Sequence, residues 1–298
     1  MLFKNQERNK ILIQLLALFA SVRGHTLFTI IFAQYLSARY IFAPQTSWEY
    51  ILTDSKLFML FMATSLAVAG GYIINNFYDA EKDQINRPFK YLLEHQASPA
   101  LQLFCYGILN FLSLLLAVFV SLRTVPFFLI YIFGLWIYSH LLKKHFWLSN
   151  LFAVILAVTP FIAIMIYFKN FSSIVFYHAS FLFLIMLIRD LIKDLENFKG
   201  DWVRNYKTIT VVFGEKTTII IINILILLTF VPIKLLIDSK EVIHSMVYYF
   251  LSLIPFLLLI VIILWKSPTQ KTYLWLHNLL KVLIVTGILS IILIRFPL

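Results

Sequence analysis

The residues of this chain that could carry chemistry gather in two polar segments. Acidic residues are scarce, 14 among 298, and most of them fall in or beside residues 77–98 and 192–216. Before and within the first segment, Asn75, Asp79 and Asp83 recur every four residues, so they share one face if the preceding apolar stretch continues as a helix. Carboxylates at this spacing repel each other, and a cation relieves the repulsion. Because carboxylate and amide oxygens are hard ligands, the pattern predicts a Mg²⁺ site.

The second segment roughly repeats this arrangement. Asp190 and Asp194 are four residues apart, and so are Asn197 and Asp201. Basic residues are mixed with the acids in both segments, namely Lys82, Arg87, Lys90, Arg189, Lys193, Arg204 and Lys207. A site for a metal-bound diphosphate needs residues of both charges: carboxylates bind the metal, and basic side chains contact the diphosphate oxygens that the metal does not coordinate. Solvated loops with surface salt bridges are the plainer alternative. A carboxylate at a membrane edge nevertheless favours a functional role, since burying it uncompensated is costly.

The composition is that of a membrane protein. Of the residues 61% are hydrophobic and 13% are charged, whereas soluble domains carry about a quarter charged residues, which excludes an ordinary soluble enzyme. Apolar runs of about twenty residues recur, each long enough to cross a bilayer. They predict about nine transmembrane helices, near residues 26–43, 56–76, 99–121, 125–142, 147–168, 172–191, 217–237, 245–265 and 273–295. The shorter apolar stretch 11–22 is expected to form an interfacial helix.

The charge pattern predicts an orientation. The net charge is +11, but the basic residues are scattered between apolar spans, which favours the lipid bilayer as partner and no nucleic acid. Lys and Arg concentrate on the side that holds the N-terminus and both polar segments. By the positive-inside rule this side is cytoplasmic, in what we expect to be a bacterial cytoplasmic membrane.

The chain is predicted to form a single transmembrane domain over residues 1–298. No Gly/Ser linker or low-complexity segment divides it. Residues 1–25 are expected to form a cytoplasmic or interfacial N-terminus, and residues 75–98 and 190–216 to form motif loops. Because four predicted spans separate these loops, two similar halves are indicated. Gly70 and Gly71 are expected to let a neighbouring helix approach closely.

The two segments resemble the motifs of the UbiA prenyltransferase superfamily. The first family motif, N-D-x-x-D-x-x-x-D followed by Asn and Pro, is matched by Asn75, Asp79, Asp83, Asn86 and Pro88, with Asn76 in place of the second residue. The second, K-D-x-x-D-x-x-G-D followed by K-T-x-x-x-x-x-G, is matched by Lys193, Asp194, Gly200, Asp201, Lys207, Thr208 and Gly214. Asn197 replaces an Asp there, and Asp194 or Glu196 could compensate for it. Further matches to the family's Y-S-x-x-L-K and G-N are Tyr138-Ser139, Leu142-Lys143 and Ser149-Asn150.

The resemblance implies an all-α, polytopic membrane fold of about nine helices around a central cavity, with cytoplasmic cap loops. It implies Mg²⁺-dependent transfer of a polyprenyl group from an allylic polyprenyl diphosphate to an acceptor. The metal ligands that it implies are Asn75, Asp79, Asp83, Asp194 and Asp201. The four aspartates and Tyr138, whose ring face could stabilise a cation, are the implied catalytic residues. Substrate contacts are implied for Arg23, Asn75, Arg87, Lys90, Lys143, Lys193 and Asn197.

Several functions stay open at this point. The layout R-D-x-x-K-D-x-x-N-x-x-G-D resembles the geranylgeranylglyceryl phosphate geranylgeranyltransferase branch, which favours a glycerol-phosphate lipid as acceptor. An aromatic quinone precursor is the alternative acceptor. An ion-coupled transporter should carry charge at span centres, where this chain has only Lys281. An inactive membrane scaffold would be compatible with Asn76 and Asn197.

Overall fold

The chain folds into two compact helical units. The computed structural model describes residues 2–292 except residues 87, 95 and 240–243. In these ranges all regular structure is helical, and no strand occurs. The first unit comprises Met1–Phe32 and Leu52–Leu142, and the second comprises Ala33–Ile51 and Lys143–Leu298. Two short helices, α2 (Gly24–Ser37) and α3 (Trp48–Thr53), lie where the chain passes between the units.

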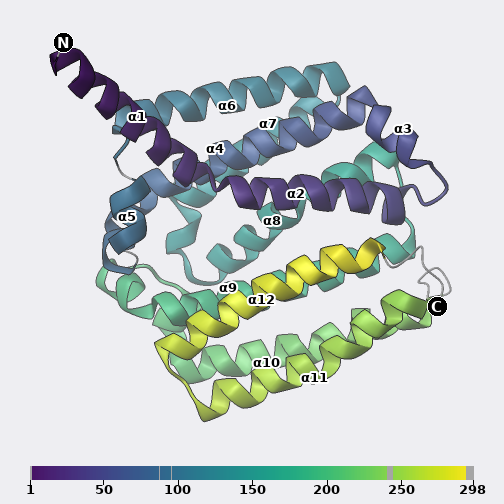
Figure 1. Cartoon of the computed structure of the whole chain (residues 1–298). Helices are drawn as coiled ribbons and strands as arrows, with labels where there is room; N and C mark the ends of the chain where they lie inside the picture. Colours follow the sequence, from purple (N-terminus) through teal and green to yellow (C-terminus); the bar gives the residue numbers. More distant parts are fainter. Residues whose placement is uncertain (1, 87, 95, 240–243, 293–298) are drawn as a thin grey trace. The chain divides into compact units, whose positions relative to one another are not determined.

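The first unit is organised around one long helix, α4. Its helices are α1 (Leu2–Val22), the first part of α2, α4 (Ser55–Asn86), α5 (Pro88–Glu94), α6 (Pro99–Val120) and α7 (Thr124–His140). α4 packs against α1, α5, α6 and α7, and α4, α6 and α7 run side by side in Figure 1. The helix that carries the first acidic motif is therefore the one on which the rest of this unit packs.

The second unit is organised in the same way around α9. It holds the π-helix Ala38–Phe42, a 3₁₀ turn over Leu142–Lys144, α8 (Phe146–Phe168), α9 (Ser173–Val203), α10 (Ile209–Asp238), α11 (His244–Lys266) and α12 (Gln270–Ser290). α9 packs against α8, α10 and α12, and α11 packs against α10 and α12. From α8 to α12 these helices run from teal through green to yellow in Figure 1. The helix that carries the second acidic motif is again the central one.

The expected number of membrane spans is confirmed. Eight described helices are long and apolar enough to cross a bilayer, and a ninth span results if the pair Leu12–Val22 and Gly24–Phe42, bent by 41°, counts as one. The bend lies at Arg23, whose backbone has a φ of 54°. Residues 11–22, expected to form an interfacial helix, thus belong to a helix that leads into the first span through this bend.

The expectation that the motifs lie in loops was wrong for their acidic residues, which lie on helices, whereas Lys207 and Thr208 do lie in the loop between α9 and α10. α4 has 32 residues and α9 has 31, which at 1.5 Å per residue makes each roughly 45–50 Å long, against about 30 Å for the hydrocarbon core. The surplus turns can therefore extend past the membrane edge as helix. Asn75, Asp79 and Asp83 lie on the last turns of α4, and Asp190 to Asp201 lie on the last turns of α9.

Close packing beside the first motif is as predicted. A Cβ added to Gly70 would lie 2.9 Å from Oδ1 of Asn110 on α6, and one added to Gly71 would lie 3.1 Å from the Cδ atoms of Leu135 on α7. The two glycines thus let both neighbouring helices approach α4.

The Lys207–Gly214 stretch after the second motif shapes the start of α10. Thr208 caps the helix by accepting a hydrogen bond from the backbone N–H of Val211. Gly214 has a φ of 82°, which glycine adopts without strain and which bends the first turns away from the rest of the helix. The backbone N–H of Lys207 donates to the carbonyl of Lys144 at 3.0 Å, which ties this loop to the 3₁₀ turn.

Candidate active site

The first unit places its motif residues on one face of α4. Helical spacing brings Asn75, Asp79 and Asp83 onto the same side, and Asp83 is buried while the other two are partly buried. The guanidinium of Arg23 lies over the ring of Tyr72, 4.9 Å from its centroid. Tyr72 precedes Asn75 by three residues on this helix, so the cation is held about one turn from the motif.

The neighbouring positions of the first motif are aromatic and polar. Tyr78 packs against the His140 ring with centroids 5.0 Å apart, and His140 stacks on Trp136 at 5.4 Å. Tyr138 lies on the same helix, α7, and is partly buried. Asn76, at the position where the family motif has an Asp, is buried, and neither of its side-chain amide atoms has a hydrogen-bond partner among the described residues.

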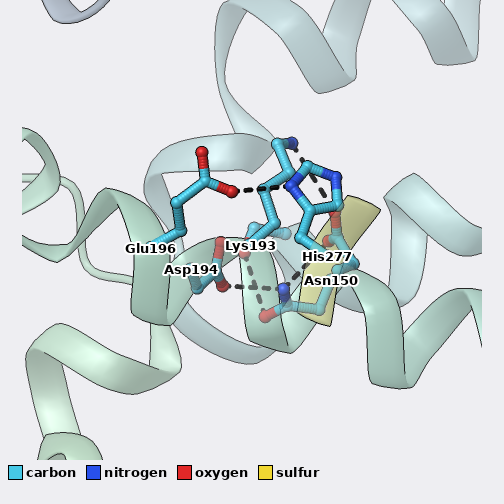
Figure 2. A network of polar contacts seen from close by, with 7 residues as sticks. Asn150, Lys193, Asp194, Glu196 and His277 are labelled. Atoms are coloured by element: carbon cyan, nitrogen blue, oxygen red, sulfur yellow. Dashed lines mark hydrogen bonds and ion pairs between the residues drawn. The ribbon is translucent and has the colours of Figure 1, made fainter. Parts of the chain in front are cut away.

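In the second unit one amide joins two carboxylates. The side-chain N–H₂ of Asn150, near the start of α8, donates to Oδ2 of Asp190 at 3.0 Å and to Oδ2 of Asp194 at 2.8 Å. Ser149 Oγ donates to Oδ1 of the same amide at 3.4 Å, and Lys193 Nζ lies 3.6 Å from Oδ1 of Asp190. Figure 2 shows this network. Both donor hydrogens of the amide are therefore used to hold the two carboxylates together.

The remaining motif residues continue this face of α9. Asp190, Asp194, Asn197 and Asp201 follow one another at spacings of four, three and four residues, which is one helical stripe. Asp194 and Asn197 are buried, and Asp201 is 0% exposed. The two pairs that the sequence predicted, Asp190 with Asp194 and Asn197 with Asp201, thus form one continuous row of three carboxylates and one amide.

This donor set suits Mg²⁺. The ion needs only one or two protein carboxylates when waters and phosphate oxygens complete its coordination, and Asp190 and Asp194 supply that number at one place. Two carboxylates placed side by side on a membrane-spanning helix also favour the binding of a cation, in addition to the contact of Asp190 with Lys193. Among the described residues, no group of three or more His, Cys, Asp and Glu side chains that could by itself hold a metal ion is found.

Sequence reasoning missed two residues of the second unit and left Glu196 undecided. Asn150 belongs to a sequence motif for which no role is predicted, and His277 belongs to none of the motifs. Glu196 was a possible replacement for the Asp absent at position 197, but its Oε2 lies 2.6 Å from Nδ1 of His277 on α12. The contacts pair Asp194 with Asp190 instead. These partners are 40 to 81 residues apart in sequence, so no local spacing could have revealed them.

The predicted basic residues are distributed over both units. Arg23 lies in the first unit, and Lys193 and the buried Lys143 lie in the second. Lys90 lies on α5, and nothing further is described of its side chain. Arg87 lies outside the described residues.

Among the described residues, at least eight helices are long and apolar enough to cross a bilayer, and two of them carry polar motifs at their ends, which defines a helical integral membrane protein. The model of the UbiA prenyltransferase family matches residues 26–281. The chain therefore belongs to the UbiA prenyltransferase family, and it is a membrane prenyltransferase by that membership.

Similar proteins agree with this assignment. A digeranylgeranylglyceryl phosphate synthase of Saccharolobus solfataricus is 26% identical over 261 residues, which is 84% of this chain and 89% of the relative. One of Sulfurisphaera tokodaii is 32% identical over 196 residues, 62% of this chain and 68% of the relative.

Solved structures show the same fold. A structure of digeranylgeranylglyceryl phosphate synthase has a TM-score of 0.73 at 20% identity and covers 94% of this chain and 98% of its own. A UbiA homologue from Archaeoglobus fulgidus, solved with GPP and Mg²⁺, has a TM-score of 0.69 at 13% identity and covers 93% and 99%.

Substituting Asn150 tests the paired carboxylates. We expect Asn150→Leu to lower the thermal unfolding midpoint in EDTA, because the loss of both hydrogen bonds costs about 1–3 kcal/mol. Adding Asp190→Asn to this variant should restore part of the loss, since it removes one of the two like charges. The measurement is thermal unfolding of the purified protein in detergent. An unchanged midpoint in Asn150→Leu would show that the amide does not hold the carboxylates together.

Proposed function

We propose that this chain transfers a polyprenyl group from an allylic diphosphate to the hydroxyl group of a glycerol-phosphate lipid, with Mg²⁺ as cofactor. In this reaction the allylic C–O bond breaks and its electron pair leaves with the diphosphate. The acceptor oxygen then forms an ether bond to the allylic carbon and releases its proton. No covalent bond to the protein is needed, so the protein has to bind, orient and compensate charge.

The observation that carries the proposal is the pair Asp190 and Asp194 joined by Asn150. A hard divalent cation with free coordination positions for phosphate oxygens fits this pair. The Archaeoglobus fulgidus homologue bound to GPP and Mg²⁺ supports the same ligands for this chain. When bound, Mg²⁺ would neutralise charge on the departing diphosphate.

Other residues would bind the metal and the diphosphate and stabilise the allylic cation. We assign metal binding in the first unit to Asn75, Asp79 and Asp83, and in the second to Asp194 and Asp201 together with Asp190. We propose that five basic residues bind the diphosphate oxygens, because charge-assisted hydrogen bonds to phosphate are strong. These residues are Arg23, Arg87, Lys90, Lys143 and Lys193. Asn197, buried on the carboxylate stripe, would donate to a substrate oxygen. Tyr138 would offer its ring face to the allylic cation, an effect of about 1–2 kcal/mol when desolvated.

The acceptor assignment rests on two supports. The relatives in Saccharolobus solfataricus and Sulfurisphaera tokodaii are named digeranylgeranylglyceryl phosphate synthases, and the spacing around Asp190 to Asp201 resembles that branch. An aromatic quinone precursor is the alternative acceptor, and the assay below includes it. Membership in a prenyltransferase family argues against the transporter hypothesis.

The charge asymmetry supports an orientation with the N-terminus and both motif ends in the cytoplasm. Cysteines at two exposed positions test it in a Cys105→Ala background, since Cys105 is the only native cysteine. In intact cells, a membrane-impermeant maleimide should label Lys169→Cys, between α8 and α9. It should label Lys207→Cys, between α9 and α10, only after the membrane is opened. The reverse labelling pattern would contradict the orientation.

A transfer assay tests the function itself. The protein in nanodiscs should transfer prenyl groups from a geranylgeranyl or longer diphosphate to geranylgeranylglyceryl phosphate when Mg²⁺ is present, and lose activity in EDTA. Asp79→Ala and Asp201→Ala should each lower turnover about 100-fold or more, because each removes charge compensation at the reacting diphosphate.

Asp238→Ala is the matched control, since Asp238 ends α10 outside both motifs, and it should keep full turnover. Transfer to a hydroxybenzoate or dihydroxynaphthoate but not to the lipid would replace the proposed acceptor. Full activity in both motif variants would overturn the metal assignment.

A further inference from the structure

The short helix α5 carries its apolar side chains on the outside. Phe89, Leu92 and Leu93 are 83%, 60% and 66% exposed, and their spacing places them on one face of the helix. Glu94, the only acidic residue of α5, is buried. A helix on the surface of a soluble protein has the reverse arrangement, with its apolar face toward the core. An exposed apolar face of this kind marks an interaction surface.

The length of α4 places α5 at the surface of the membrane. α4 has 32 residues and is therefore roughly 45–50 Å long, whereas a bilayer with its headgroups is about 40–45 Å thick. When α4 crosses the bilayer, its last turn consequently lies at the level of the headgroups. α5 begins at Pro88, two residues after α4 ends at Asn86, and it lies beside that end (Figure 1). The exposed face of α5 is thus within reach of lipid.

The helix α1, which packs against α5, has a lipid-facing side of its own. Four of its large apolar side chains are exposed and follow one another at helical spacing, namely Leu12, Leu15, Leu16 and Phe19. Its opposite side packs through Ala17 and Leu18 against Ala97. Because residues 12–22 form the first half of a bent membrane span, the exposed stripe faces lipid. α5 is therefore a direct neighbour of a helix that already contacts the bilayer.

The charge of this part of the sequence also suits a lipid surface. Residues 84–96 include the basic residues Arg87 and Lys90 and a single acidic residue, the buried Glu94. Basic residues beside an apolar helix face are typical of segments that lie at the headgroups of anionic lipids. Apolar and basic residues thus occur together in a segment that begins where a membrane-spanning helix ends.

We propose that α5 is an interfacial helix that inserts Phe89, Leu92 and Leu93 into the leaflet on the side of the two motifs. Its partner is the boundary between headgroups and acyl chains, where the apolar face leaves water. Since α5 follows α4 almost directly, its insertion would fix the depth of the last turns of α4, which carry Asp79 and Asp83. The inference rests on the membrane fold and is independent of the prenyl group and the acceptor.

Spin labels on the full-length protein in nanodiscs test the insertion directly. Phe89→Cys and Leu93→Cys are labelled one at a time in a Cys105→Ala background, and collisions with oxygen, which dissolves in lipid, are compared with collisions with a water-soluble nickel chelate. Both labels should collide more often with oxygen. Phe111→Cys, on an exposed position of α6 within a span, gives the lipid reference, and Lys207→Cys, in the exposed loop after α9, gives the water reference.

Two results of this measurement would overturn the proposal. Collisions mainly with the nickel chelate at both positions would show that the face of α5 lies in water. Few collisions with either reagent, together with an immobilised spectrum, would show that protein covers the face, from this chain or from a second copy. Neither result would bear on the proposed prenyl transfer, and a protein without transferase activity would still give the same answer about α5.

Hydrogen exchange gives a second readout that needs no label. In nanodiscs, Leu93→Gln should speed the exchange of the α5 backbone amides about tenfold or more, because a polar side chain gives up the apolar contact that keeps the helix on the bilayer. Leu122→Gln is the matched control, since Leu122 is an exposed leucine between α6 and α7, and it should leave α5 unchanged. Equal exchange of α5 in Leu93→Gln and in the unmodified protein would contradict the insertion.

Discussion

The close approach of two carboxylates near the end of a membrane-spanning helix is the constraint on which the rest of this structure depends. Asp190 and Asp194 lie one turn apart on α9, and the single amide of Asn150 donates to both. A neutral amide orients the two carboxylates without adding a charge of its own, and we propose that the pair binds a divalent cation. Because α9 packs against α8, α10 and α12, the position of this pair within its unit is fixed by three neighbouring helices.

The two motifs depart from the family pattern in different ways. In the first unit Asn75, Asp79 and Asp83 keep the family spacing, and the departure at Asn76 leaves a buried amide without a hydrogen-bond partner among the described residues. In the second unit Asn197 stands at a usual carboxylate position, but Asp190 adds a carboxylate to the same stripe one turn before Asp194. The carboxylate pair is thus shifted along the helix, and Glu196 is used for a different contact, with His277.

What could be predicted from the sequence is what depends on neighbouring residues. Apolar runs predicted the spans, four-residue spacing predicted a shared face for Asn75, Asp79 and Asp83, and Gly70 and Gly71 predicted close packing that the structure confirms. The motif segments were expected to be loops because polar residues end a span, yet their helices simply continue past it. Asn150 and His277 could not be assigned, because their partners come from other helices. The metal and substrate roles of the site residues stay predictions, as does the single domain.

The most direct test of the account is the position of the metal. Crystals grown with Mn²⁺ in place of Mg²⁺ and a non-hydrolysable allylic diphosphate would show the ion by its anomalous scattering. We predict an anomalous peak within coordination distance of Asp190 or Asp194, about 2.0–2.2 Å as for other hard cations of this size, with diphosphate oxygens in the same coordination sphere. A diphosphate bound with the ion away from both carboxylates would contradict it.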